Sequence, residues 1–228
     1  MRTWLVSFAR RGPARYLSHL DTLRAVQRTF ARAGVELELS EGMRPKPRLS
    51  LPLPLPVGAA ADDELAVARV TDAAPEARAG LVALRAAAPE GVEVIALRES
   101  PLRARPQPLH ARYACEVRGD ADAVAAAVEA FVGGEPPRVV RRGPKGTKTI
   151  DLRRSVEVVS CRATPGGAHL EFEVRYDVGT AARPQEVIEV IADKAGIEPV
   201  LHRLRRVEVV FAEAARAQHA PTQRSART

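Results

Sequence analysis

Three arginines near the N-terminus carry the first chemical signal in the chain. Arg24, Arg28 and Arg32 are four residues apart, within a stretch (18–34) whose apolar residues recur at the spacing of a core-facing helix. Residues four apart on a helix lie on one face, so the three guanidinium groups form a row that could bind phosphate or carboxylate. A solvated arginine face without a ligand is the alternative, because exposed helix faces are usually charged.

Residues at both ends of this stretch predict where the helix begins and ends. Ser18 and Asp21 have the spacing of a capping box, and Gly34 stands where a left-handed C-terminal cap is expected. His19 then falls at the first helical position. We consider it as a general acid or base together with Asp21 or Asp151, whereas a histidine that only contacts the helix end is the simpler interpretation.

The loop after the helix combines positive charge with a stiff backbone. It contains, in alternation, Arg44, Pro45, Lys46, Pro47 and Arg48. The prolines favour an extended chain, in which side chains two residues apart project to the same side, so the three cations would line one edge as an anion site. The following prolines, in 51–58, exclude a central strand and predict a stiff edge segment or the wall of a groove, with a rigid crossover as the alternative.

A second basic segment spans residues 138–155. Its cations that we consider for anion binding lie around a glycine turn: Lys145, Lys148 and Arg153. Glycine turns offer backbone N–H groups to a phosphate, but the spacing of a nucleotide-binding P-loop is absent, so nucleotide hydrolysis has no support. Asp151 could accept a proton, although a plain surface ion pair is the simpler interpretation.

Composition limits the class of protein. With 228 residues and 46% hydrophobic residues, the chain can bury a sizeable core, and charges interrupt every apolar stretch, so we expect no membrane segment. Its net charge of +7 is concentrated in the two basic segments. The two cysteines, Cys115 and Cys161, have no metal-binding spacing, so we expect a cytoplasmic protein with no metal site and no cofactor of its own.

The order of expected elements repeats along the chain. In the first half we expect strands at about 2–9, 35–39, 48–53, 64–70 and 91–98, with helices at 18–33 and 75–88. In the second half we expect strands at 111–118, 138–142, 155–162, 168–176 and 200–211, with helices at 121–132 and 184–195. The pattern predicts an α+β fold of tandem ferredoxin-like (split βαβ) halves with antiparallel sheets, in domains 1–100 and 109–211, followed by a disordered tail at 212–228.

Three segments of the sequence also resemble a known family. They are YLSHLDTLRAVQRTFARAGVELELSEGMRPKPRLSLPLPLPVG, KGTKTIDLRRSV and LHRLRRVEV, and the likeness spans roughly residues 2 to 210. The family is the bacterial radical-SAM-linked (radical-SAM-associated) family, a domain of unknown function. The resemblance implies a radical SAM partner enzyme that acts on RNA, with the iron–sulfur cluster and S-adenosylmethionine bound to that partner.

Cysteine content limits what this chain contributes to such chemistry. A radical SAM enzyme holds its cluster with three closely spaced cysteines, and this chain has two, far apart. We therefore expect an accessory module that recognises an RNA substrate. A protein-docking subunit without RNA contact, and a stand-alone RNA-processing enzyme that uses His19, are the alternatives.

Overall fold

The computed structural model describes residues 2–100, 106–143, 146–177, 179–198 and 203–212. The first half contains β1 (Arg2–Arg10), the 3-10 helix η1 (Gly12–Tyr16), α1 (His19–Arg32), β2 (Leu49–Ser50), β3 (Ala60–Val70), α2 (Ala77–Ala87) and β4 (Val92–Ser100). The second half contains β5 (Pro108–Arg118), α3 (Ala121–Gly133), β6 (Arg138–Gly143), β7 (Gly146–Asp151), the 3-10 helix η2 (Leu152–Arg154), β8 (Val156–Thr164), β9 (Gly167–Arg175), α4 (Pro184–Ala195) and β10 (Arg205–Phe211). The predicted disorder of the tail falls almost entirely on residues 213–228, which lie outside the described residues.

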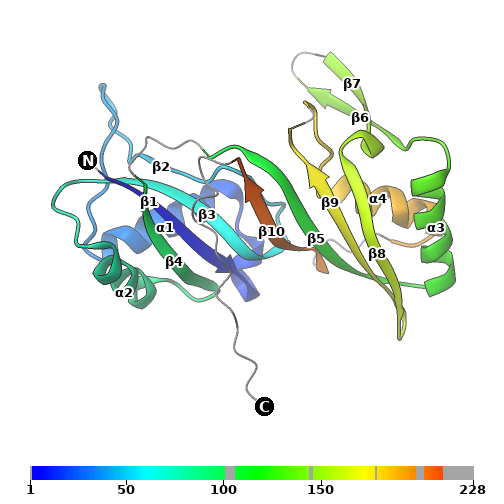
Figure 1. Ribbon diagram of the computed structural model, residues 1–228, viewed down its shortest axis with the longest axis horizontal. Helices are drawn as coiled ribbons and strands as arrows, with labels where there is room; N and C mark the ends of the chain where they lie inside the picture. Colours follow the sequence, from blue (N-terminus) through cyan, green and yellow to red (C-terminus); the bar gives the residue numbers. More distant parts are fainter. Residues whose placement is uncertain (1, 101–105, 144–145, 178, 199–202, 213–228) are drawn as a thin grey trace.

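One mixed sheet runs through both halves. Its order is β4-β1-β3-β10-β5-β9-β8, with β2 paired to β3, and in Figure 1 β10 lies between β3 and β5 in the middle of the molecule. The α+β class with a mostly antiparallel sheet is therefore confirmed. We expected separate antiparallel sheets, however, whereas Arg205 and Arg206 of β10 pair in parallel with Ala60 and Ala61 of β3 and join the strands into one sheet.

The chain order around the sheet is the same in the two halves. In the first half, β1 lies between β4 and β3, and β2 pairs with the edge of β3 that faces away from β1. In the second half, β5 lies between β10 and β9, and β8 is the edge strand. The β6–β7 hairpin is an insertion between α3 and β8 and forms a separate two-stranded sheet.

The helix ends of α1 follow the predicted capping residues. The Ser18 hydroxyl accepts a hydrogen bond from the Asp21 N–H at 3.1 Å, which satisfies a free donor of the first turn. Gly34 has φ of +67°, and the N–H of Val35 donates to the Phe30 carbonyl at 3.0 Å. This left-handed glycine ends the helix because it turns the chain without a Cβ clash.

The loop between α1 and β3 has less strand than the sequence predicts. The expected strands at 35–39 and 48–53 are reduced to the two-residue β2 and to isolated bridges at Leu37 and Leu39. Leu39 pairs with Pro47, and the Ser40 N–H donates to the Lys46 carbonyl at 2.8 Å, so the residues between them form an exposed hairpin-like tip. Proline removes the donors that a longer ladder would need.

The buried apolar side chains form two groups, and the group beneath α3 and α4 also includes residues of the first half, such as Leu5 and Leu65. Trp4, Phe8 and Phe30 belong to the core beneath α1 and α2, and Tyr113 and Phe172, whose rings stack with centroids 5.5 Å apart, belong to the core beneath α3 and α4. No helix in the described part of the chain has the length and hydrophobicity needed to cross a membrane.

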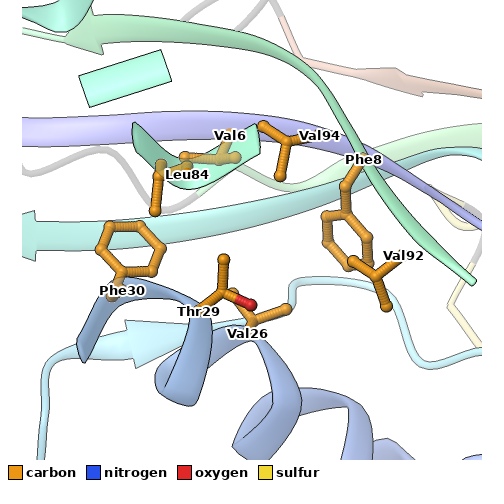
Figure 2. Close-up of a pocket in the computed structure, with 8 residues that line it drawn as sticks. All are labelled: Val6, Phe8, Val26, Thr29, Phe30, Leu84, Val92 and Val94. Carbon is orange, nitrogen blue, oxygen red and sulfur yellow. The ribbon is translucent and has the colours of Figure 1, made fainter. Parts of the chain in front are cut away.

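The first core contains a small cavity of about 10 Å³. Figure 2 shows the eight lining side chains, which come from β1, α1, α2 and β4: Val6, Phe8, Val26, Thr29, Phe30, Leu84, Val92 and Val94. The Thr29 hydroxyl already donates to the Ala25 carbonyl at 3.0 Å. A space of this size with no free polar partner is expected to stay empty of water.

Candidate functional site: two basic surfaces and a proline-walled groove

Asp21, the acidic residue in the first turn of α1, makes contacts that stabilise the start of the helix. The hydrogen bond from the Ser18 hydroxyl at 2.6 Å, together with Arg24, lowers the pKa of the Asp21 carboxyl. Arg24 pairs with Asp21 at 3.1 Å. His19 is half-buried at the first helical position, and no hydrogen bond joins it to Asp21 or Asp151 within the described residues. Its role in catalysis stays a prediction.

Helix α1 and the proline loop meet at one surface hollow. The hollow has a volume of about 370 Å³, and its lining includes Gln27 and Ala31 of α1, Pro47 of the loop and, as its charged residue, Glu36. Arg28 and Arg32, the neighbours of Gln27 and Ala31 in the helix, are exposed. We call this surface the helix–loop surface and define it by Arg24, Arg28, Arg32, Arg44 and Lys46.

The cations of the α1 face and of the proline loop differ in their hydrogen-bond and ion-pair partners. Arg28, Arg32, Arg44 and Lys46 are exposed, and their side chains make no hydrogen bond or ion pair with the rest of the described chain. Arg48, by contrast, turns back toward the protein, where its Nε lies 3.5 Å from Glu38 Oε2 and donates to the Leu39 carbonyl at 3.3 Å. Of the three loop cations predicted to form a row, only Arg44 and Lys46 therefore extend from the described protein, while Arg48 binds Glu38 and the Leu39 carbonyl.

The second basic segment lies in the β6–β7 hairpin, which projects at the end of the molecule that carries α3 and α4 (Figure 1). Lys148 of β7 is exposed, and Lys145 lies outside the described residues. Arg153 does not extend into solvent, since it donates to the Phe131 and Gly134 carbonyls at 2.9 and 2.7 Å and caps the C-terminal end of α3. Asp151 accepts from the Arg153 N–H at 3.0 Å and lies 4.0 Å from Arg154 Nε, so it caps η2 and pairs with Arg154.

An ion pair anchors the hairpin to α4. Arg141 of β6 donates to both carboxylate oxygens of Glu186, at 2.6 and 2.5 Å, and to the Ala181 carbonyl at 2.9 Å. Burial alone would raise the pKa of Glu186, but these bonds and one from the Arg183 N–H outweigh it and lower the pKa. The carboxylate is therefore held in its charged form.

Replacing Arg141 by methionine is expected to cost about 2 kcal/mol at pH 7, since a charged hydrogen-bonded pair is lost. The folded pKa of Glu186 is below its ordinary value of 4.5. The stabilisation is thus present above the unfolded pKa and is lost as the pH falls through the folded one. Urea unfolding from pH 7 to about pH 3 should show the difference between the two proteins shrinking with acid. Arg142→Met, at an exposed neighbouring position, should behave like the unchanged protein, and a pH-independent loss would contradict the assignment.

Buried arginines hold the proline segment against the sheet. Arg206 of β10 donates to the Leu53 and Pro54 carbonyls at 3.0 and 3.2 Å, and its Nε donates to Glu64 Oε1 at 3.0 Å. Arg10 of β1 donates to the Pro56 and Ala59 carbonyls at 3.3 and 3.2 Å. Both side chains are 1% exposed. The carbonyls of a segment without strand partners are thus satisfied by side chains, an arrangement that leaves no signal in the local sequence.

This segment forms one wall of a groove, as the sequence predicted. The groove has a volume of about 390 Å³ and lies between Leu53–Pro56 and the residues before and at the start of α4 (Ala181–Gln185), with Tyr176 as a further lining residue. The Tyr176 hydroxyl lies 2.8 Å from the Tyr113 hydroxyl. Burial, and then the neighbouring Tyr113, raise the pKa of Tyr176, so the phenol stays neutral.

Comparisons with known proteins identify a family. The sequence profile of the family described as "Uncharacterized protein conserved in bacteria (DUF2344)" matches residues 4–184. A comparison with curated proteins found no match.

Two solved structures show weak likeness. A chain of a crystallised Cbf5-Nop10-Gar1 complex is 13% identical and has a TM-score of 0.48, and the match covers 90% of this chain and 48% of that one. This chain therefore spans about half the length of that protein. An unknown protein from Galdieria sulphuraria is 13% identical with a TM-score of 0.27, and the match covers 92% and 98% of the two chains. Neither likeness supports a statement about function.

Proposed function

The chain belongs to this uncharacterized bacterial family, DUF2344, and we propose that it is a cytoplasmic RNA-binding accessory module that recognises the substrate of a radical SAM partner enzyme in RNA modification. The observation that carries the RNA contact is the helix–loop surface. There, Arg28, Arg32, Arg44 and Lys46 are exposed and have no ion-pair partner in the described chain, on two segments that also line one hollow.

The chemistry of this surface fits a phosphate backbone better than a base. Arginine and lysine bind phosphate oxygens, and the affinity of such contacts is largely independent of sequence. Aromatic residues make up only 4% of the chain, so few rings are present for base stacking. We infer that the surface recognises RNA by its backbone and shape.

The number of cysteines is the reason for assigning the iron–sulfur cluster to a partner rather than to this chain. Cys115 is buried, and burial, with a smaller effect of Glu116, raises the pKa of its thiol to about 12. Cys161 is half-buried on β8, which β9 separates from the β5 strand of Cys115. Two cysteines do not provide the three thiolates of a radical SAM cluster. We therefore assign the cluster and S-adenosylmethionine to the partner.

We further propose that the two halves are tandem ferredoxin-like units. Each half runs β-α-β-β-α-β, apart from the β6–β7 insertion, and places its first strand between its fourth and its third. This order is that of the split βαβ fold. The short β2 then represents the second strand of the first unit.

RNA binding is tested by charge reversal on the helix–loop surface. We expect a fluorescein-labelled single-stranded RNA of mixed sequence to bind with an affinity that falls steeply with salt. Replacing Arg28, Arg32 and Lys46 by glutamate should weaken binding and reduce the slope of log Kd against log salt by about 2, at roughly 0.7 for each lost phosphate contact. Fluorescence anisotropy between 50 and about 300 mM KCl measures both.

The control variant carries the same change in net charge at three exposed positions elsewhere: Arg78, Arg162 and Lys194. It should keep most of the affinity. Equal losses in the two variants would show non-specific attraction, and salt-independent binding would remove the RNA proposal. If the chain instead co-purifies with the radical SAM enzyme after nuclease treatment and binds no RNA, the docking alternative stands. RNA cleavage that is lost in His19→Ala would favour the enzyme alternative.

A further inference from the structure

A second cleft, distinct from the helix–loop surface, lies at the junction of the two halves. It has a volume of about 450 Å³, and five segments line it: Arg15 of η1, Ala60 of β3, Ala114–Glu116 of β5, His169 of β9 and Arg203–Arg205 at the start of β10. An adjoining hollow of about 380 Å³ shares Glu116 and Arg203 and adds Arg118. The combined space is large enough for a small molecule such as a nucleotide.

Small side chains at the junction leave this space open. Arg205 pairs across the sheet with Ala60 on one side and with Ala114 on the other. Methyl groups on both sides cannot fill the room that larger residues would occupy. The cleft is therefore a consequence of the strand register at the point where β10 joins β3 to β5.

The lining of the cleft contains three arginines, Arg15, Arg203 and Arg205, and contacts within the protein hold two of them in place. Arg15 donates from Nε to the Gly58 carbonyl at 2.9 Å, and its guanidinium lies over the Tyr16 ring, 5.5 Å from the centroid. Arg205 is tied to Asp62 through Nη1 at 3.2 Å. Each therefore keeps N–H donors that face no protein acceptor. Fixed guanidinium groups lose less conformational entropy when they bind an anion.

Arg203 is the cation of the cleft with no partner within the described residues, since its side chain makes no hydrogen bond or ion pair there. Acidic groups are fewer than arginines in the lining. Glu116 is the acidic lining residue, and its Oε1 lies 2.6 Å from Nδ1 of His169. Asp62, beside Arg205, also pairs with Arg11 at 3.3 Å. Three arginines and one glutamate thus line the cleft, so its lining carries a net positive charge.

We propose that this cleft binds the phosphate group of a nucleotide-sized phosphate monoester. The planar fork of arginine donates two parallel hydrogen bonds to phosphate oxygens, and such forks come from two segments of the lining: Arg15 of η1, and Arg203 and Arg205 at the start of β10. The proposal does not depend on RNA binding at the helix–loop surface. A free nucleotide and the terminal phosphate of an RNA strand offer the same group, and the test separates them.

Calorimetric titration of the full chain with AMP, and with adenosine as the matched ligand without phosphate, tests the proposal. We expect AMP to bind and adenosine not to bind. Arg203→Gln should weaken AMP binding by about tenfold or more, because a charge-assisted pair is lost, and Arg203→Lys should lose less. Since the Arg203 side chain makes no hydrogen bond or ion pair with a described group, these variants are expected to fold, which thermal unfolding checks. Arg154→Gln, at a side chain that is 85% exposed, is the control and should bind AMP normally.

Further results of these titrations would decide the outcome. Absence of AMP binding, or equal binding by Arg203→Gln and the unchanged protein, would overturn the proposal. The variant with Arg28, Arg32 and Lys46 reversed should keep its AMP affinity, so a failure of the RNA proposal leaves this one standing. A short RNA with a 5′-phosphate that binds more tightly than AMP, and competes with it, would identify an RNA end as the source of the phosphate. The opposite order would identify a free nucleotide.

Discussion

Replacing Arg206 by methionine is expected to lower the free energy of unfolding by about 3–5 kcal/mol, the cost of leaving one partner of a buried ion pair alone. Arg206 is 1% exposed, and its partner Glu64 is 4% exposed. Burial would lower the pKa of Arg206, but the nearby Glu64 carboxylate outweighs it and raises the pKa, so the guanidinium stays charged. Methionine fills similar space but leaves the carboxylate and the Leu53 and Pro54 carbonyls without a donor.

Urea unfolding followed by circular dichroism measures this loss. Arg205→Met, one residue earlier, removes an ion pair whose arginine side chain is 49% exposed and should cost less than about 1 kcal/mol. Adding Glu64→Gln to Arg206→Met should recover part of the stability, because the uncompensated charge is gone. A loss below about 1 kcal/mol for Arg206→Met would mean that the pair contributes nothing beyond an apolar contact. The proline segment should also become accessible to proteases, since Arg206 no longer binds its carbonyls.

Truncation of Leu84 to alanine is expected to cost about 4–5 kcal/mol, in the upper part of the range for buried leucine. Leu84 is fully buried on α2 and lines the cavity between α1, α2, β1 and β4 (Figure 2). The deleted methyl groups would enlarge an existing void rather than create a new one. The penalty grows with the volume of the cavity that remains, and close-packed neighbours relax only partly.

Thermal and urea unfolding measure the effect of Leu84→Ala. Leu81→Ala, one turn earlier on the same helix and only partly buried, is the matched control and should cost roughly half as much or less. Val26→Ile, which adds a methylene toward the cavity, should restore part of the lost stability in the Leu84→Ala background. If Leu84→Ala and Leu81→Ala cost the same, the cavity does not contribute to the penalty.

The local sequence was sufficient for the helices and most strands. The apolar stripe of residues 18–33, the Ser18 cap and Gly34 predict α1 within a residue at each end, because capping and periodicity depend on neighbours in the chain. The alternation in 168–176 predicts β9 equally well. The loop after α1 was less predictable. Its prolines lack the backbone N–H that a β-ladder needs. Whether the other backbone groups of the loop form hydrogen bonds depends on which distant segment packs beside them.

Among the candidate site residues, the sequence likewise predicted the exposed helix cations but not the arginines that bind distant parts of the protein. The cations of α1 are exposed as their helical spacing predicts, and Arg28 and Arg32 remain without partners in the described structure. Arg48 and Arg153 had the same sequence signal, but they bind protein groups: Glu38 and the Leu39 carbonyl for Arg48, and the carbonyls at the end of α3 for Arg153. A backbone carbonyl gives no sequence signal, so an arginine that binds one looks like an arginine that binds a ligand.

By itself, the sequence determined the class of fold, the helix boundaries and the concentration of positive charge in two segments, because periodicity, caps and charge are local properties. Only the tertiary structure decided which arginines are free, since their competitors are carboxylates and carbonyls from distant residues. It also decided that one sheet joins the halves and that Arg15, Arg203 and Arg205 meet in a cleft. Those juxtapositions depend on the register of β10 between β3 and β5, which no local pattern specifies.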